Sequence, residues 1–470
     1  MSDTGRRLSL FALTAMVVGS MVGAGIFSLP RSFGAATGVV GAVVAWTITG
    51  VGMYALARVF QTLAEVRPDL DAGVYSFAQA GFGHYAGFLA AVGYWLVGCI
   101  ADVSYWVLIK STLGAAFPVF GDGNTVAAVA VSSVGIWLYH ALVLRGIKSA
   151  AAVNAVVTVA KILPILAFVA LVALAFDADR FASNLWGAGG DVALVGAVEQ
   201  VRSTMLITIF VFIGIESASV YSRYAQKRTD VGIATIGGFL MVLILMVLAT
   251  LLPYAVLPAT ELGNLRQPSM ASVLERVVGT WGAVFVGGGL IVSVLGAYLA
   301  WSLITIEVPF AAARAGDMPR FLARESRRGV PVASLWLSNG VIQVLLILTL
   351  FSDDAFTTLV KLTSTMVLVP YLLSALFAVK LGSASGQVSL MQRFWAVAAT
   401  IFALVMIVGA GLQFLLLSSL LYIPATALYV VARREQGRSV FTRVELIMFG
   451  ILLLAATAGV YGLATGAIGL

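Results

Sequence analysis

The sequence predicts an all-α integral membrane protein, and composition, hydropathy and the spacing of the apolar runs all support this. Of its 470 residues, 61% are hydrophobic and 10% are charged, and the mean hydropathy is +1.03. Soluble domains carry about 25% charged residues. Apolar runs of about twenty residues, each long enough to cross a bilayer as a helix, recur along the whole chain. This pattern excludes a soluble protein and is typical of a helical bundle rather than an outer-membrane barrel.

The expected spans follow one another with short connections. They cover residues 10–34, 38–62, 83–116, 124–144, 151–176, 196–222, 232–254, 280–313, 332–351, 355–380, 393–412, 414–433 and 443–466. This makes about thirteen helices, or twelve if the crowded region 393–433 is divided differently. A full-length span follows the first nine residues, so we expect no removable signal peptide.

Basic residues fall in alternate connections. One set of loops holds Arg6, Arg7, Arg58, Arg67, Arg145, Lys148, Arg223, Lys227, Arg228, the run 314–328, Lys380, Arg393, Arg433, Arg434, Arg438 and Arg443. The other set holds Asp122, Asp177, Asp179, Asp191, Glu261, Asp353 and Asp354, with Arg180, Arg266 and Arg276 scattered among them. The positive-inside rule then predicts a cytoplasmic N-terminus. The net charge of +7 is mostly a topology signal, so we expect membrane lipids and no nucleic acid as partners.

The first expected span is interrupted by three glycines within seven residues, Gly19, Gly23 and Gly25. Each glycine in a helix interior costs about 0.5–1 kcal/mol relative to alanine. Broken helices are tolerated at membrane depth only where protein or a water-filled cavity surrounds them. The interruption therefore predicts a binding site, and the alternative is a small-residue face that packs against a neighbouring helix.

The sixth expected span holds a second interruption, where Gly214 lies next to Glu216, Ser217 and Ser219. Two interrupted spans five places apart are typical of an inverted-repeat transporter whose substrate site lies at the bilayer midplane. We therefore expect a transporter core over 1–380, made of two five-helix repeats over about 8–176 and 192–380. Residues 381–470 would form additional C-terminal transmembrane helices.

Two segments carry a family resemblance. Residues 23–30, with Gly23, Gly25 and Pro30, and residues 212–219 resemble the two signature segments of the amino acid/polyamine/organocation transporters, in particular the basic amino acid/polyamine antiporters. Residues 70–75, 143–148 and 368–371 resemble the arginine/ornithine antiporters among them. The resemblance implies a leucine-transporter-like fold in the bacterial inner membrane. It also implies exchange of a cationic amino acid, arginine, for a related product, ornithine, by alternating access.

A half-helix that begins inside the membrane presents unpaired N–H groups and a partial positive charge, which suit a carboxylate. The resemblance implies that the N–H groups around Ala24 and Gly25, with Ile26 beside them, bind the α-carboxylate of the substrate. Family members often have Ser where Ala24 stands, so this chain lacks one hydroxyl donor.

A half-helix that ends inside the membrane presents carbonyl oxygens, which suit an ammonium. The resemblance assigns the carbonyls of Met21, Phe210 and Ile213 to the α-ammonium, next to Gly214. Phe210 and Trp301 would form walls and could stack on a guanidinium or an ammonium. The alternative for both aromatic residues is ordinary core packing.

Charged residues inside the expected spans are few, and each costs about 2.5–3.5 kcal/mol on insertion scales unless it is paired or functional. Asp102 stands where similar antiporters usually have Asn, close to the substrate side chain, and a carboxylate there favours a cationic cargo. The alternative is that Asp102 pairs with Lys110 or Lys361. Lys361 falls near a position where the family offers small hydroxyl groups to the distal end of the substrate, and Ser364 could supply one.

Two further charges are expected to act in coupling and gating. Lys161 resembles the lysine of sodium-independent relatives whose ammonium fills the space of a sodium ion. Glu216 resembles the family glutamate that links substrate occupancy to gate movement, and it could carry a proton. The alternative for Lys161 is a structural contact with a cluster of carbonyls.

No cofactor, metal site or enzymatic activity is expected. Cys99 is the only cysteine, the two histidines have no metal-site spacing, and no phosphate-binding loop is present. The functional alternatives are a proton-coupled amino acid symporter and an exchanger of lysine for cadaverine or of arginine for agmatine. A channel, a sensor or a membrane-embedded enzyme ranks below these. The sequence does not determine whether the chain forms a homodimer.

Overall fold

The computed structural model describes residues 9–70, 73–145, 147–187, 194–216, 228–384 and 388–469. Throughout these residues the secondary structure is α-helix with short 3-10 segments, and no strand is present. Some residues of the predicted patterns lie outside the described part: Arg6, Arg7, Asp71, Asp191, Ser217, Ser219, Arg223 and Lys227.

The first five spans begin with a helix in two pieces, α1 (Leu10–Met21) and α2 (Leu29–Gly34), joined by the 3-10 segment η1 (Gly25–Ser28). They continue with α3 (Val39–Val66), α5 (His84–Gly114), α6 (Val126–Leu144) and α7 (Ile147–Leu174). The sequence places three glycines within seven residues where the first span divides, whereas α3 and α5 are continuous although they also contain glycines. The predicted boundaries agree with these helices to within a few residues.

The next five spans begin with α9 (Leu194–Phe210), which also ends in the middle of an apolar stretch. They continue with α11 (Arg228–Leu251), α14 (Thr280–Arg314), α15 (Val332–Leu348) and α16 (Ala355–Ala384). The additional C-terminal helices are α17 (Leu390–Gly409), α18 (Leu412–Glu435) and α19 (Arg443–Ala464). Discontinuous spans in the first and sixth positions thus confirm the predicted leucine-transporter-like fold class.

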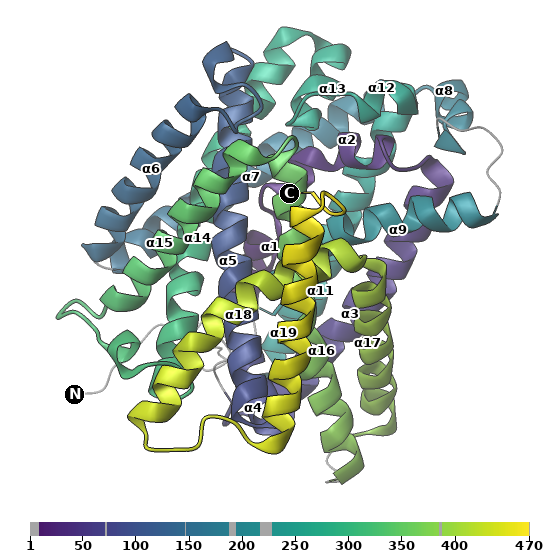
Figure 1. The fold of residues 1–470 in the computed structure, drawn as a ribbon. Coiled ribbons are helices and arrows are strands. Elements are labelled where there is room, and N and C mark those ends of the chain that lie inside the picture. The colour runs from purple at the N-terminus through teal and green to yellow at the C-terminus, as the bar shows by residue number, and fades with distance from the viewer. Residues whose placement is uncertain are drawn as a thin grey trace.

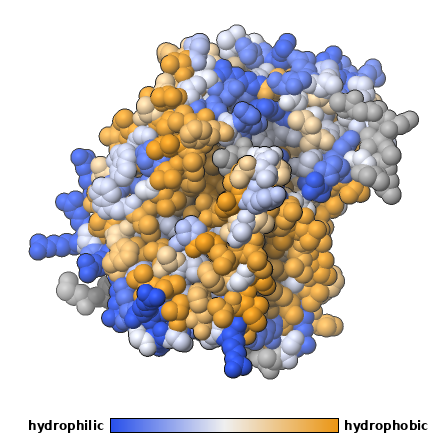
Figure 2. All heavy atoms as spheres, viewed as in Figure 1, coloured by the Kyte–Doolittle hydropathy of each residue, from blue (hydrophilic) through white to orange (hydrophobic). Residues whose placement is uncertain are grey.

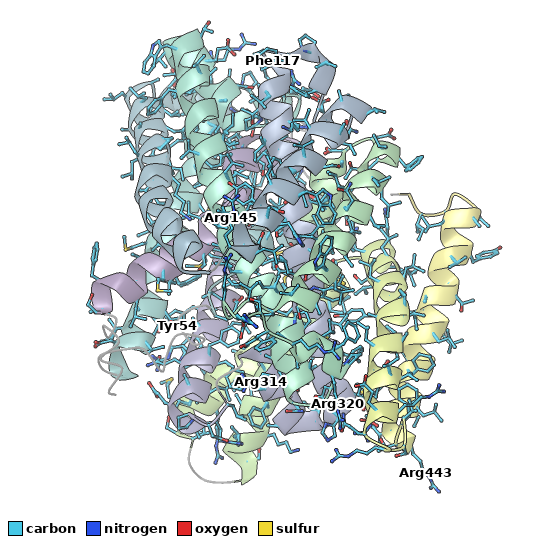
Figure 3. The ribbon with its side chains drawn as sticks, turned by 90° about the vertical axis from the view of Figure 1, so that its left-hand side faces the viewer. Tyr54, Phe117, Arg145, Arg314, Arg320 and Arg443 are labelled. Atoms are coloured by element: carbon cyan, nitrogen blue, oxygen red, sulfur yellow. The ribbon has the colours of Figure 1, made fainter. Side chains whose placement is uncertain are left out.

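Eleven helical segments in the described part are long and apolar enough to cross a membrane. The two other predicted spans, 151–176 and 196–222, correspond to α7 and α9. Figure 2 shows a hydrophobic band around the middle of the molecule, with hydrophilic residues gathered at its upper and lower ends. In Figure 3, Phe117 lies near one end, and Arg314, Arg320 and Arg443 lie towards the other. The chain is therefore a multi-pass membrane protein.

The helix α5 runs through the centre of the bundle and packs against α14 and α16 (Figure 1). The helix α1 packs against α11, and α3 packs against α9, α11 and α17. The helices α18 and α19 pack on each other at the periphery. This arrangement surrounds the broken spans with protein, as free backbone groups inside a membrane require.

Four short helices lie in connections for which no helix was predicted. They are α4 (Val74–Phe82), α8 (Ala178–Ser183), α12 (Ala259–Gly263) and α13 (Ser269–Val278). Figure 1 shows α4 at the lower end of the bundle and the other three at the upper end. Gly83, with φ of +91°, separates α4 from α5 because glycine adopts this conformation readily. Helices this short give little periodic signal in a sequence.

Candidate functional site

The break in the first span lies between Met21 and Gly25. The last regular helical bond runs from the N–H of Val22 to the carbonyl of Val18, and Gly23 instead donates to Met21 at 3.0 Å. The 3-10 segment then begins after Ala24, whose side chain supplies no cap. The opening N–H groups of a helical segment have no partner within that segment. The break thus holds the two kinds of group predicted for it, carbonyls that end one half-helix and N–H groups that begin the next.

The break in the sixth span begins after Phe210, where α9 ends. The chain then makes tight turns, with hydrogen bonds from Phe212 to Ile209 at 3.0 Å and from Ile215 to Phe212 at 3.2 Å. Gly214 has φ of +108°, a conformation that other residues rarely adopt. This backbone conformation therefore requires glycine at position 214.

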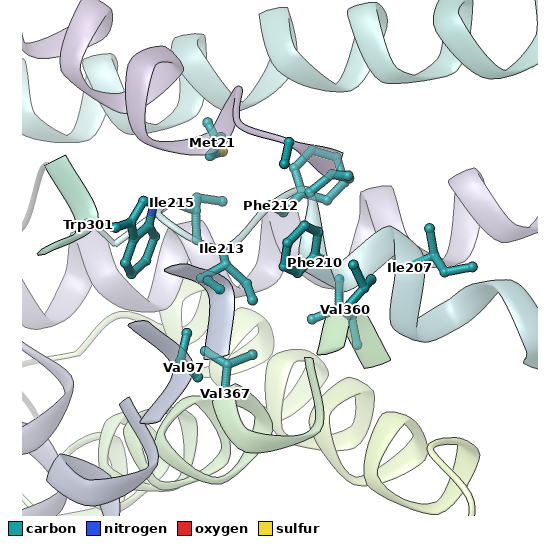
Figure 4. Packing of buried hydrophobic residues seen from close by; sticks show 14 of the residues in the cluster. Met21, Val97, Ile207, Phe210, Phe212, Ile213, Ile215, Trp301, Val360 and Val367 are labelled. Atoms are coloured by element: carbon teal, nitrogen blue, oxygen red, sulfur yellow. The ribbon is translucent and has the colours of Figure 1, made fainter. Parts of the chain in front are cut away.

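The two breaks touch each other. The Ser20 hydroxyl donates to the carbonyl of Gly214 at 2.9 Å. A Cβ atom on Gly25 would lie 2.6 Å from Val211 Cγ1 and 2.8 Å from Phe210 Cδ1, so only glycine fits at this point. In Figure 4, Met21 faces Ile213, with Trp301 and Phe210 to either side.

A narrow hollow lies where the breaks meet. Six of the predicted site residues line it: Met21, Ala24, Gly25, Phe210, Ile213 and Trp301. The other lining residues are Ser20, Gly23, Ala101, Tyr105, Val211 and Thr363. Residues of both breaks, with three aromatic residues among the lining, therefore converge on one small space.

Two other predicted substrate residues lie beside the hollow. Ile26 is fully buried in the hydrophobic core. Gly214 is held at its carbonyl by Ser20. Tyr105 was not predicted to line the site. It lies one turn after Ala101, so both residues are on the same face of α5.

The carboxylate of Glu216 lies at the sixth-span break and is fully surrounded by protein. Its Oε1 accepts a hydrogen bond from Tyr94 of α5, and its Oε2 accepts one from Tyr371 of α16 at 2.7 Å. The N–H of Gly214 also donates to Oε2, at 3.2 Å. Glu216 therefore connects the break to two neighbouring helices. No role for the two tyrosines was predicted, because a tyrosine in an apolar span gives no sequence signal until its hydroxyl partner is known.

Lys161, on α7, is buried, and its ammonium donates to the carbonyl of Gly19 in the last turn of α1. A carbonyl near the end of a half-helix is a favourable acceptor for a cation. The contact joins α7 to the first-span break, next to the hollow.

Asp102, on α5, is fully buried next to the hollow-lining Ala101. Ser302 of α14 donates to its Oδ2 at 3.1 Å. Neither of the lysines considered as partners forms an ion pair with it in the described part of the chain. The Lys110 ammonium lies over the rings of Trp106 and Phe120, at 5.5 and 5.4 Å.

Two predicted residues of α16 do not line the hollow. The Lys361 ammonium lies 5.8 Å from the ring centroid of Phe414, on α18. The Ser364 hydroxyl donates to the carbonyl of Leu206 on α9 at 2.5 Å and to that of Val360 at 2.9 Å. Spacing along a helix did not reveal these orientations, because a shift of one residue turns a side chain by about 100°. Among the described residues no cluster of three or more metal-ligating side chains is found.

Comparison with known proteins fits this architecture. The amino acid permease family model matches residues 8–460. The chain is 45% identical to the arginine/ornithine antiporter of Pseudomonas aeruginosa, over 99% of this chain and 98% of that protein. It is 40% identical to the L-lysine transport protein of Corynebacterium glutamicum, over 99% and 97%, and 36% identical to the arginine/agmatine antiporter of Chlamydia trachomatis, over 97% and 96%. With two broken spans meeting at a hollow and a family match over nearly its whole length, the chain belongs to the amino acid permease family, within the amino acid/polyamine/organocation superfamily.

Proposed function

We propose that this chain is an antiporter that exchanges arginine for ornithine by alternating access. The observation that carries the proposal is the meeting of two broken spans at one hollow that residues of both breaks line. An α-amino acid carries one carboxylate and one ammonium, and this arrangement offers a partner for each. The printed name of the Pseudomonas aeruginosa relative supports the choice of substrates.

The substrate backbone is bound at the breaks in this proposal. The N–H groups around Ala24 and Gly25, beside Ile26, bind the α-carboxylate. The carbonyls of Met21, Phe210 and Ile213 bind the α-ammonium. Gly214, with φ of +108°, holds the turn of the second break, in which the carbonyl of Phe210 also accepts the N–H of Ile213 at 3.3 Å.

The substrate side chain extends past Trp301 towards Asp102, whose carboxylate favours a cationic end. From α16, Ser364 acts indirectly by holding the end of α9 in place through its bond to Leu206, whereas the Lys361 ammonium lies over Phe414. Glu216 and Lys161 tie the two breaks to the surrounding helices and couple occupancy of the site to the movement between its two open states.

The proposed setting is the inner membrane of a bacterium, with the N-terminus in the cytoplasm. The core consists of repeats over 8–176 and 192–380, and 381–470 add peripheral helices in contact with membrane lipids. All groups of the proposed site come from one chain, so exchange needs no second copy, and a homodimer would only place two independent sites side by side. Transport involves no covalent chemistry, no enzymatic activity and no nucleic acid.

Proteoliposomes loaded with ornithine test the proposal. We expect them to accumulate labelled arginine, and empty vesicles to accumulate almost none. Equal uptake by empty vesicles under a pH gradient would instead indicate a proton-coupled symporter. Counterflow with lysine, cadaverine and agmatine would then rank the cargoes, because the relatives named for lysine and for arginine/agmatine make these the natural competitors.

A further inference from the structure

Asp102 is a buried carboxylate with unusually few hydrogen-bond partners. Its exposed fraction is 0%, and it lies in the middle of α5, the central helix of the bundle. Its Oδ2 accepts the hydroxyl of Ser302 at 3.1 Å. Its Oδ1 is buried and accepts no hydrogen bond from any residue that the structure describes.

The second buried carboxylate of the site has a different environment. Glu216 accepts hydrogen bonds from two tyrosine hydroxyls and one backbone N–H, and both of its oxygens have a partner. A carboxylate with two or three donors can keep its charge without a counterion. Asp102, with one donor, lacks this compensation.

Among the described residues, the groups around Asp102 do not supply a positive charge. The ionisable side chains that interact with it electrostatically are Cys99 and Tyr105, on its own helix, and Tyr298, on α14. All three are neutral or acidic, and Ser302 is neutral. In the described part of the chain, no ion pair involves Asp102, and Lys110 and Lys361 contact aromatic rings instead.

A buried charge without a partner costs several kcal/mol, so the charge of Asp102 must be neutralised whenever the surrounding helices are closed. Asp102 does not itself line the hollow, but Ala101 and Tyr105, on the same helix, do. Two cations are candidates to neutralise Asp102 from this side. One is the distal guanidinium or ammonium of a cargo. The other is a proton.

We propose that Asp102 is a charge-compensating residue that takes either the distal cation of the cargo or a proton, so that a neutral cargo is carried together with one proton. This inference rests on the proposed exchange function and extends it to neutral amino acids. When a neutral cargo enters, a proton from the same side of the membrane adds to the carboxylate and leaves on the other side with that cargo. Ser302 holds Oδ2, so Oδ1 is the oxygen that receives the cation or the proton.

Citrulline is the decisive probe, because it has the shape of arginine with a neutral urea group in place of the guanidinium. Vesicles containing the wild-type protein, loaded with arginine and a lumenal pH dye, are exposed to citrulline. We expect citrulline entry to acidify the lumen by one proton for each arginine that leaves, and external arginine to cause no change in pH. We also expect citrulline uptake to increase as the external pH falls.

The variant Asp102→Asn removes the proton site and keeps the size of the side chain. We expect it to exchange arginine for citrulline without acidification, so that the exchange moves net charge and becomes sensitive to an imposed membrane potential. The wild-type exchange of this pair should be insensitive to the potential. Asp69→Asn is the matched control, since it removes an exposed carboxylate that pairs with Arg67, and it should behave as the wild type does.

Each outcome bears on the inference. Citrulline exchange by the wild type without a proton, or rejection of citrulline at every pH, would overturn it. Loss of the proton signal in Glu216→Gln, with the signal retained in Asp102→Asn, would assign the proton to Glu216 and also overturn it. If Asp102→Asn does not fold, the wild type and Glu216→Gln still test the inference, because absence of the proton signal in the wild type, or its loss in Glu216→Gln, would overturn it. Absence of any arginine exchange for ornithine would instead reject the proposed function itself.

Discussion

The hydroxyl of Ser20 donates to the carbonyl oxygen of Gly214 at 2.9 Å and so joins the break in the first span to the break in the sixth. The same two residues are in close contact, since a Cβ atom on Gly214 would lie 2.9 Å from Ser20 Oγ. Residues 194 positions apart in the sequence therefore form one unit. This contact fixes the position of one break relative to the other, and with it the relative position of the backbone groups in the proposed substrate site.

Replacement of Gly214 by alanine should slow exchange strongly. The backbone at this position has φ of +108°, and the added methyl group would collide with Ser20. Strain of this kind costs about 1–3 kcal/mol, and relief of the strain would displace the carbonyls next to it. We expect Gly214→Ala to lower the rate of ornithine-driven arginine uptake by tenfold or more, a fall of about 1.4 kcal/mol in transition-state stabilisation.

Gly237→Ala is the control for this variant. Gly237 lies within α11, and nothing lies within 4 Å of the position of an added Cβ atom. Alanine is the better helix former there, by about 0.8–1 kcal/mol. We expect normal uptake and an equal or higher melting temperature in detergent. Normal uptake by Gly214→Ala would show that the shape of the second break does not matter for transport.

The parts of the fold that could be predicted from the sequence are the helices, from the apolar composition, and the helix breaks, from the positions of glycine. Long apolar runs set the helices, and glycines marked the breaks, since a Cβ atom would collide with Val211 and Phe210 at Gly25 and Gly214 has a positive φ. The side-chain partners could not be predicted in the same way. Tyr94 and Tyr371 meet Glu216 only because α5 and α16 cross beside the break, which is a property of the packing.

Orientation around a helix was the weakest part of the site prediction. Lys361 was expected near the substrate, yet its ammonium lies over Phe414 of α18. The α16 residue that lines the hollow is Thr363, two positions further along. The polar and apolar residues of α16 form no pronounced amphipathic stripe that shows which face is inside, so helical spacing alone cannot identify the lining residues.

Loss of the Tyr371 hydroxyl should slow the movement of the carrier more than it weakens substrate binding. Tyr371→Phe leaves Oε2 of Glu216 with the N–H of Gly214 as its remaining donor among the contacts described above. A buried acceptor that loses a partner costs about 1–3 kcal/mol. We expect about a tenfold lower maximal exchange rate, with the KM for arginine within about twofold of the wild-type value.

Tyr422→Phe is a suitable comparison, because the buried Tyr422 hydroxyl has no hydrogen-bond partner in the described part of the chain. This variant should exchange arginine at the wild-type rate. A raised KM for Tyr371→Phe, with an unchanged maximal rate, would place Tyr371 in substrate binding and contradict a role in the conformational step.

Exchange should not depend on sodium. The Lys161 ammonium contacts the carbonyl of Gly19 next to the first break, and a cation already bound there disfavours a second one at short range. Replacement of sodium by choline on both sides of the membrane should leave the rate of arginine uptake unchanged. Lys161→Met should reduce this rate, because the carbonyl loses its partner. A wild-type rate that falls without sodium would contradict this assignment.

A polar cluster at the end of α14 joins the two halves of the chain. The buried carboxylate of Asp317 accepts hydrogen bonds from Tyr75 at 2.9 Å and from Gln79 at 2.7 Å, both on α4. Its other oxygen lies 2.7 Å from Nδ1 of His84. Burial raises the pKa of Asp317, and the contacts with His84 and Tyr75 offset part of this increase.

This cluster predicts a pH dependence of stability. Above the ordinary pKa of 3.8 the folded protein keeps a proton on Asp317 that the unfolded chain has released. The contribution of this group to stability therefore falls as the pH rises from 3.8 towards the folded-state pKa. Asp317→Asn cannot titrate, so its melting temperature in detergent should fall less with increasing pH between about pH 4 and pH 7 than that of the wild type.

Asp69→Asn serves as a comparison, because the contribution of Asp69 to stability changes with pH in the opposite direction. The hydrogen bond from Arg67 lowers the pKa of Asp69, so the stability that this pair contributes is present above pH 3.8 and is lost as the pH falls. The effect should be small, because the Asp69 side chain is 58% exposed. If the melting temperatures of Asp317→Asn and the wild type change with pH in parallel, the Asp317 cluster does not take up a proton on folding. The three hydrogen-bonding contacts would then serve only to hold α4 and the start of α5 against the end of α14.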